Sequence, residues 1–439
     1  MKKILFLIAA IVMNFAVYSQ TANEYFDRGS IKDSLKEYSG AISNYNKAIK
    51  MNPKYAVAYY KRGNAKGCLK DYRGSIADFN KAVEINPQHA DAYNNIGLAK
   101  CNLKDYRGSI IDFTKAIEIN PKYANAYCNR ANAKGNIQDN KGAIADYSKA
   151  IEIDSMLAEP YYNRANCKYI LKDYKGAVAD YTKAIDINPK DADSYFKRGM
   201  GKDDTKDYNG AIADYSKTID HDIKSAEAYY NRGIAKNSSK DYTGAIEDYN
   251  KAIALNPKTS NYYNNRGIAK DNLQEYNAAI VDYTKAIQLN HKSSIAYFNR
   301  GIAKSNLNNN KGAVADYNRA NAFSPKTSYI YNNRGVAKNN LKDSKGAIAD
   351  YTKAIEININ YADAYYNRGI TKSILKDNKG AIADYTKAIE INPNYTDAYY
   401  NRGIAKLKAG QKESGCFDIS KAGELGLAKA YETIKSNCN

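Results

Sequence analysis

The sequence has little histidine, and the few histidines are scattered. His89, His221 and His291 stand far apart, each at or near the boundary between two of the sequence units described below. Nucleophilic and metal catalysis need several reactive groups brought together, and no serine–histidine–acid set, metal-ligand spacing or phosphate-binding loop is apparent. We therefore expect no enzymatic activity, no cofactor and no bound metal.

Cysteine is also scarce, with six in 439 residues and no C-x-x-C pair. The spacings fit no zinc pattern, which excludes the common structural zinc modules. Cys416 and Cys438 flank the last predicted helices, and cysteines can oxidise in an exported protein. We predict a disulfide between these two residues that clamps the C-terminal end, and two free thiols are the alternative.

Long apolar runs are absent except near the N-terminus. Residues 4–17 form an apolar run interrupted only by Asn14; this run follows Lys2 and Lys3 and leads into a candidate cleavage site at Val17-Tyr18-Ser19. This pattern is typical of a secretory signal peptide, and the run is shorter than the roughly 20 residues of a membrane span. We predict that residues 1–19 are removed, with a retained anchor as the alternative. The mature chain is then secreted, periplasmic or at the cell surface, without an integral membrane segment.

What the sequence does contain is a repeat of fixed length. Arg-Gly or a close variant recurs every 34 residues, twelve times without insertion or deletion, within residues 22–429. The eighth position of each unit is glycine or alanine, from Gly29 to Gly403. A period of this size indicates stacked supersecondary units rather than one globular core, and such arrays bind partners along an extended surface.

Each unit is predicted to be a helix, a turn and a second helix. In residues 362–395, apolar residues recur at three- and four-residue spacing in both halves. Lys376-Asp377-Asn378 form a polar break, and the unit ends at Pro393, which cannot continue a helix. Tyrosine holds the fourth position of all twelve units, and we expect it to pack between helices rather than to form a ligand cage.

These residues resemble the tetratricopeptide repeat, a helix-turn-helix unit with small residues at its eighth, twentieth and twenty-seventh positions and proline at its thirty-second. Alanine holds the twenty-seventh position in eleven units, with Thr218 the exception, and proline holds the thirty-second in seven. The resemblance implies an all-α, right-handed superhelical solenoid of stacked repeats. In that fold, the first helices line a concave groove and the second helices lie outside.

The last unit departs from this pattern. Gly415 replaces alanine at the twentieth position, and the stretch from Lys421 to Gly426 resembles the related Sel1-like repeat. A terminal helix is predicted from Ala428 to Lys435. Because a repeat array needs a terminal element with a polar outer face, we predict that residues 430–439 form a C-terminal capping tail.

A second departure concerns charge. Arginine holds the seventh position in eleven units, lysine the eleventh in all twelve, and aspartate the twenty-third in eleven. The family usually has apolar residues at the seventh and eleventh positions. A partly buried charge is costly unless it is paired, so we expect an ion-pair network within the array, such as Arg368 with Asp384. The alternative is a ladder of cations that binds anions.

The family geometry places the sixth and ninth positions at the groove. Asparagine holds the sixth in nine units, and its amide can bond the backbone of an extended peptide without reading the peptide's sequence. The ninth position is aliphatic in the six late units, and a contiguous apolar strip usually marks a partner surface. The alternatives are that the asparagines bond helix to helix and that neighbouring helices cover the aliphatic side chains. The predicted peptide-binding residues are Asn231, Asn265, Asn299, Asn333, Asn367, Asn401, Ile234, Ile268, Ile302, Val336, Ile370 and Ile404.

The formal net charge of +19 does not indicate nucleic acid. Acidic residues such as Asp91 and Glu159 stand at the second, groove-facing position, where a phosphate strand would need cations. The sequence therefore predicts an exported scaffold that binds a protein or peptide partner in its groove. The rival hypothesis is an envelope or anionic-glycan binding module that uses basic residues of the outer face, such as Lys251 and Lys387, and that salt would weaken.

Overall fold

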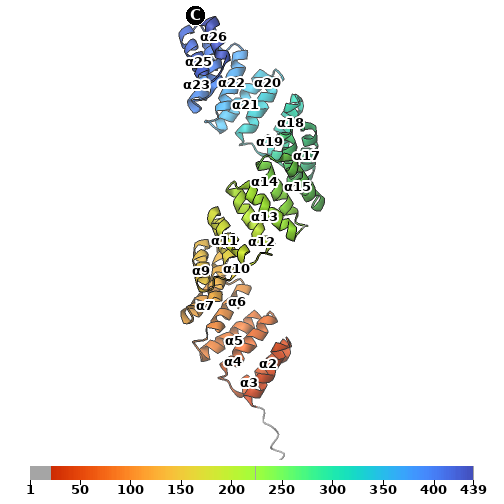
Figure 1. Cartoon of the computed structure of the whole chain (residues 1–439), viewed down its shortest axis with the longest axis vertical. Coiled ribbons are helices and arrows are strands. Elements are labelled where there is room, and N and C mark those ends of the chain that lie inside the picture. The colour runs from red at the N-terminus through yellow and green to blue at the C-terminus, as the bar shows by residue number, and fades with distance from the viewer. Residues whose placement is uncertain (1–20, 223, 439) are drawn as a thin grey trace, which may run out of the picture. The chain divides into compact units, whose positions relative to one another are not determined.

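A computed structural model describes residues 21–222 and 224–438, and the regular elements in that part of the chain are all α-helices. The predicted signal peptide, residues 1–19, lies outside the described residues. The chain divides into two compact units, unit 1 ending at His221 and unit 2 beginning at Asp222, and each is described by itself. In each unit the helices stack in pairs along the chain, as the colour sequence in Figure 1 shows.

Even-numbered helices from α2 to α24 are the first helices of the repeats, and odd-numbered helices from α3 to α25 are the second helices. The helices of unit 1 are α2 (Ala22–Ser34), α3 (Tyr38–Met51), α4 (Ala56–Cys68), α5 (Tyr72–Ile85), α6 (Ala90–Asn102), α7 (Tyr106–Ile119), α8 (Ala124–Asn136), α9 (Asn140–Ile153), α10 (Ala158–Ile170), α11 (Tyr174–Ile187), α12 (Ala192–Asp204) and α13 (Tyr208–His221).

Unit 2 continues with the same alternation and ends in one further helix. Its helices are α14 (Ala226–Ser238), α15 (Tyr242–Leu255), α16 (Ser260–Asn272), α17 (Tyr276–Leu289), α18 (Ser294–Asn306), α19 (Asn310–Phe323), α20 (Ser328–Asn340), α21 (Ser344–Ile357), α22 (Ala362–Ile374), α23 (Asn378–Ile391), α24 (Thr396–Lys408), α25 (Lys412–Glu424) and α26 (Lys429–Asn437). The predicted all-α fold of stacked helix-turn-helix repeats is confirmed.

The turn inside each repeat is held by a short local motif. In the repeat 362–395, Lys376 has a φ of 65°, a left-handed conformation that costs an L-residue about 1 kcal/mol. The side chain of Asp377 then caps α23 by accepting a hydrogen bond from the backbone N–H of Gly380 at 2.9 Å. A Cβ at residue 380 would lie 2.2 Å from that carboxylate, so a larger residue would displace the cap; where Ala278 holds this position, α17 has no side-chain cap. The predicted polar break is therefore a capped turn.

The two helices of a repeat approach closely because the eighth position is small. A Cβ added to Gly301 would lie 2.6 Å from the ring of Tyr317, which is 1% exposed. The small residue at the twentieth position also contacts the first helix: the Ser75 hydroxyl donates to the Gly63 carbonyl at 2.7 Å. Small residues at both positions thus set the distance between the paired helices.

The first helices line the inner side of each unit. Successive first helices contact one another, as α20 contacts α22 and α22 contacts α24, whereas contacts between successive second helices are sparser. In a curved stack, the elements on the inner side approach each other most closely. The sixth and ninth positions of the first helices therefore belong to the concave side within each unit.

The C-terminal end of unit 2 is covered by α26. Ala430 is buried together with Ile419 and Ala422 of the preceding helix. Cys416 and Cys438 are joined by a disulfide, which ties α26 to α25. The helix spans Lys429–Asn437, slightly beyond the predicted end at Lys435.

Candidate peptide-binding face on the first helices

The charged positions of each repeat form an ion network between helices. Two nitrogens of Arg368, Nε and Nη2, donate to the two oxygens of Asp384 at 3.0 and 2.7 Å, and Lys372 lies 2.8 Å from the same carboxylate. The third nitrogen, Nη1, donates to Thr352 of the preceding repeat at 2.9 Å. The guanidinium also lies over the ring of Tyr365. The arginine therefore joins two helices of its own repeat to the repeat before it.

This network confirms the predicted pairing of Arg368 with Asp384, and arginine–aspartate pairs of the same kind occur in ten repeats. The cations are thus already paired with carboxylates, which argues against an anion-binding ladder in those repeats. In the repeat 90–123, Ile96 replaces the arginine and Lys100 alone holds Asp112, at 2.6 Å. Burial raises the pKa of the Asp112 carboxyl above its usual value, and Lys100 opposes that rise.

The predicted asparagines of unit 2 contribute to repeat stacking. Most of their amide nitrogens donate to the fifth position of the preceding first helix: Asn265 to Tyr230 at 2.9 Å, Asn299 to Asn264 at 3.2 Å, Asn367 to Asn332 at 3.1 Å and Asn401 to Tyr366 at 2.9 Å. Asn333 instead donates to the carbonyl of Tyr329 in its own helix at 2.8 Å, and no hydrogen bond of the Asn231 side chain is seen among the described residues.

These bonds use the amide nitrogens and leave the side-chain carbonyl oxygens to be accounted for. An asparagine side chain has a carbonyl oxygen as well as an N–H₂ group. Within the described part of unit 2, the side-chain oxygens of Asn299, Asn367 and Asn401 accept no hydrogen bond, whereas that of Asn265 accepts one from Asn264 at 3.2 Å. The amide nitrogens therefore support stacking, while several oxygens remain possible acceptors on the concave side.

The predicted aliphatic residues at the ninth position are half-buried in all six repeats: Ile234, Ile268, Ile302, Val336, Ile370 and Ile404. Ile370, for example, packs against the buried residues Ala381, Tyr385 and Ala405. Neighbouring helices thus cover one side of this stripe and leave the other side accessible.

The structure brings three predicted site residues together between α22 and α24. Ile370, Ile404 and Asn401 line a cavity of about 270 Å³. Its other lining residues are Ser373, Ile374, Tyr385 and Lys408. The cavity therefore combines aliphatic walls with an amide and one cation.

Sequence reasoning missed one feature of the twelfth position. The side-chain oxygen Oδ1 of Asp271 is buried and has no hydrogen-bond partner among the described residues. Burial raises the pKa of this carboxyl. The geometry of the family also places the twelfth position at the border of the groove, but burial of its polar atoms is visible only in the tertiary structure.

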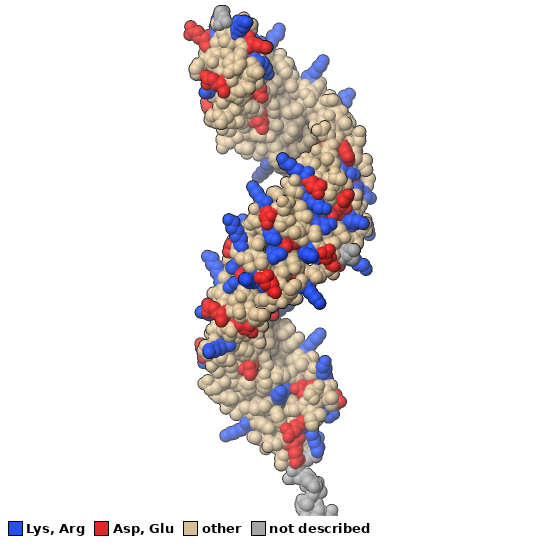
Figure 2. Space-filling view, viewed as in Figure 1, with Lys and Arg blue, Asp and Glu red and all other residues tan. Residues whose placement is uncertain are grey.

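The described residues contain no group of three or more histidine, cysteine or acidic side chains placed to hold a metal ion. In the same part of the chain, the helices are too short and too polar for any to cross a bilayer. On the face of each unit drawn in Figure 2, basic and acidic side chains are interspersed.

Models of the tetratricopeptide repeat match most of the array. The matched segments are residues 22–67, 56–89, 90–123, 124–155, 158–191, 226–259, 260–293, 328–360, 362–395 and 384–416. The chain belongs to the tetratricopeptide repeat family. This tetratricopeptide repeat protein is a protein–protein interaction scaffold, whereas the resemblance of its last repeat to Sel1-like repeats stays a prediction.

Several solved structures are similar to this tetratricopeptide repeat protein. YrrB, described as a TPR protein with an unusual peptide-binding site, is 23% identical over 41% of this chain and 92% of its own, with a TM-score of 0.39. Yeast Tom70 is 18% identical over 87% and 94%, with a TM-score of 0.41. A tetratricopeptide repeat protein from Parabacteroides merdae is 20% identical over 56% and 98%, with a TM-score of 0.46. No curated protein matches this chain.

Proposed function

We propose that unit 2 holds an extended peptide segment of a partner protein on the concave face of its first helices. The observation that carries this proposal is the cavity in which Ile370, Ile404 and Asn401 meet. The face combines half-buried aliphatic side chains with asparagine oxygens, and the same pair of positions recurs in each repeat of the unit. No catalytic role is proposed for it.

The chemistry of the face suits an extended chain. The asparagine oxygens accept hydrogen bonds from peptide N–H groups, at about 1 kcal/mol each. The aliphatic residues take up apolar side chains, each of which contributes about 1.5–3 kcal/mol when fully buried. In an extended segment, alternate side chains point to one side, so one row can face the helices while the backbone stays within reach of the amides.

The test is an affinity pull-down from the envelope fraction of the producing cell, with residues 20–439 as bait. The variant carries Ile370→Asn and Ile404→Asn, because Asn132 and Asn166 occupy the same ninth position in unit 1. These substitutions should preserve the fold and remove the apolar walls. We expect the variant to lose a partner that the native bait holds, by about tenfold or more in affinity for two apolar contacts.

A second variant separates peptide capture from stacking. This variant carries Asn299→Ala and Asn367→Ala, which remove the side-chain oxygens and also the hydrogen bonds to the preceding first helices. The circular dichroism spectrum and melting temperature of the variant must therefore be compared with those of the native chain. If the native bait and the folded Ile370→Asn, Ile404→Asn variant hold a partner equally, the concave face of unit 2 is not the binding site.

One observation favours a second candidate, binding of an anionic glycan on the second helices of unit 2. The cation at the twenty-sixth position is paired with an acid three residues later in the last three repeats, for example Lys387 with Glu390 at 2.6 Å. In the three repeats before them, Ala254, Gln288 and Ala322 replace that acid. There the exposed cations form no ion pair among the described residues; they are Lys251, Lys285 and Arg319. A partner that both baits retain and that salt releases would favour this surface.

Export is part of the proposal. The apolar run at 4–17 and the cleavage site at Val17-Tyr18-Ser19 support removal of residues 1–19, and the disulfide between Cys416 and Cys438 suits an oxidising compartment. We expect the mature protein to begin at Gln20 and to lie outside the cytoplasm. Mass spectrometry of the intact chain, purified from its native cell, checks this, and an N-terminus at Met1 would contradict it.

A further inference from the structure

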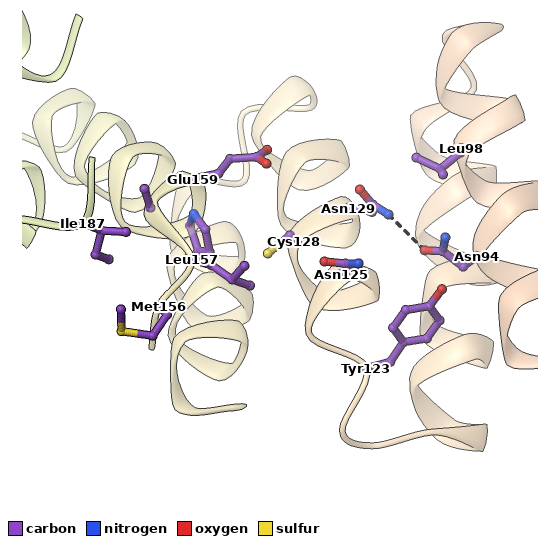
Figure 3. A pocket seen from close by; sticks show the side chains of 12 residues that line it. Asn94, Leu98, Tyr123, Asn125, Cys128, Asn129, Met156, Leu157, Glu159 and Ile187 are labelled. Atoms are coloured by element: carbon purple, nitrogen blue, oxygen red, sulfur yellow. Dashed lines mark hydrogen bonds between the residues drawn. The ribbon is translucent and has the colours of Figure 1, made fainter. Parts of the chain in front are cut away.

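A second cavity, of about 540 Å³, opens in unit 1 between α6, α8 and α10 (Figure 3). It exists because two consecutive repeats have small residues at the fifth position of the first helix, Asn94 and Cys128. The flanking repeats have tyrosine there, Tyr60 and Tyr162. We call this cavity the Cys128 notch.

The missing volume corresponds to two rings. In three other repeats the fifth-position ring lies against the residue at the end of the same repeat, with ring centroids 4.6 Å apart for Tyr60 and His89 and 4.8 Å apart for Tyr366 and Tyr395. In the repeat that begins at residue 124, Cys128 and Leu157 replace both members of this pair. Neither side chain is large enough to fill the space, so the notch stays open.

The notch has one charge. Of the twelve residues that line it, all of them described, Glu159 alone is ionisable with a full charge at neutral pH. Figure 3 shows its side chain reaching from α10 toward the helix that carries Cys128 and Asn129. Its carboxylate accepts a hydrogen bond from the side-chain amide of Asn163 at 3.4 Å, and no cation lines the cavity.

The rest of the lining provides acceptors and apolar walls. Asn129 donates to the side-chain oxygen of Asn94 at 3.0 Å, which leaves the Asn129 oxygen without a hydrogen bond within the described residues. Met156 and Leu157 supply apolar surface on the opposite side, as Figure 3 shows. Cys128 is 7% exposed, and burial raises its pKa to about 12, so its thiol is neutral and adds no charge.

We infer that the Cys128 notch binds a cationic side chain, arginine above all, of an extended peptide. A guanidinium has five N–H donors and no acceptor, which matches a carboxylate beside an amide oxygen. The methylene stem of the side chain contacts the apolar wall while its head meets Glu159. The notch lies in unit 1, so this inference goes beyond the peptide site proposed for unit 2 and does not depend on it.

The test uses two blocked peptides, Gly-Gly-Arg-Gly-Gly and the same sequence with citrulline, which has the shape of arginine without the charge. The protein is residues 20–439 with Cys68→Ser, Cys101→Ser and Cys167→Ala. Other repeats have serine or alanine at these positions, so the fold should persist, and Cys128 remains the one thiol outside the disulfide. The rate at which a small thiol reagent modifies Cys128 reports occupancy of the notch.

We expect the arginine peptide to slow modification of Cys128, and the citrulline peptide to need about three to ten times the concentration for the same protection, as for a half-exposed ion pair. Glu159→Gln should abolish that difference. Because the Glu159 charge also raises the pKa of Cys128, the unprotected rate of this variant should be somewhat higher, and protection is compared with each protein's own unprotected rate. Equal protection by both peptides, or no protection at up to about 10 mM peptide, would overturn the inference.

The matched control is Cys128→Tyr, which restores one of the two missing rings, the one found in the flanking repeats, and so occupies part of the notch. We expect calorimetry to show loss of arginine-peptide binding while circular dichroism and the melting temperature are retained. If the arginine peptide still binds the Cys128→Tyr protein but no longer binds the Ile370→Asn, Ile404→Asn variant, the notch is not its binding site. That result would contradict the inference and would be consistent with the site proposed in unit 2. The opposite pattern would support the notch and count against unit 2 as the site for this peptide.

Discussion

Replacing Asp316 by alanine is expected to destabilise unit 2 by about 2–4 kcal/mol, because it leaves two partly buried cations without a counter-ion. Asp316 accepts hydrogen bonds from Arg300 at 2.9 and 2.7 Å and pairs with Lys304 at 2.7 Å. The carboxylate is almost fully buried, whereas both cations retain some exposure, which reduces the penalty below that of a fully buried pair. Urea unfolding measures the loss.

The sequence itself supplies the control. Arg300→Ile reproduces the repeat that contains Ile96, where Lys100 alone holds the aspartate. We expect this variant to lose about 1–2 kcal/mol, because the remaining carboxylate keeps one partner. Since each repeat contacts only its neighbours, the loss should be local, with faster hydrogen exchange in α18 and α19 than elsewhere in the unit. Equal losses for both variants would show that the carboxylate is not the centre of the network.

Replacing Gly301 by leucine is expected to cost about 3 kcal/mol or more, because the close contact between α18 and α19 leaves no room for a side chain. The first added carbon would already lie 2.6 Å from Cε1 of Tyr317. Tyr317 is fully buried and cannot move without displacing its neighbours. Chemical denaturation and the near-ultraviolet circular dichroism of the tyrosines measure the effect.

Gly301→Ala is the matched substitution. Ala131 and Ala165 stand at the same eighth position in unit 1, both fully buried, and their repeats keep the aromatic residue at the twenty-fourth. We therefore expect alanine to change stability by less than about 1 kcal/mol, since it requires only a small shift of the ring and improves helix propensity. A loss as large as that of leucine would mean that the spacing in this repeat differs from that in unit 1.

Much of the fold could be read from the sequence because its signals are local and repeated. The helical period and Pro393 predict the two helices of the repeat 362–395, observed as α22 and α23. The pairing of Arg368 with Asp384 was also predictable, because arginine and aspartate recur together at the same two positions in ten of the twelve repeats and cannot be buried alone.

The candidate site was less predictable. The sixth-position asparagines can be recognised as groove residues from the family pattern, but not the direction in which their amides point. In the structure the nitrogen of Asn401 already donates to Tyr366, whereas its oxygen accepts no hydrogen bond from the described residues and remains available to a peptide. The Cys128 notch had a weak signal, two consecutive small residues at the fifth position, yet its volume also depends on Leu157 at the far end of the repeat.

The sequence by itself determined the helix-turn-helix repeat, its period, its capped turns and its internal charge pairing, because these depend on residues within one repeat. Tertiary structure alone decided which polar atoms remain unpaired and where space remains between helices. Both depend on side chains from two or three repeats meeting at once: the oxygen of Asn367 is available because its nitrogen reaches Asn332, and the notch is open because no ring from α6, α8 or α10 fills it. Hydrogen-bond satisfaction and packing are properties of such neighbourhoods rather than of any single segment.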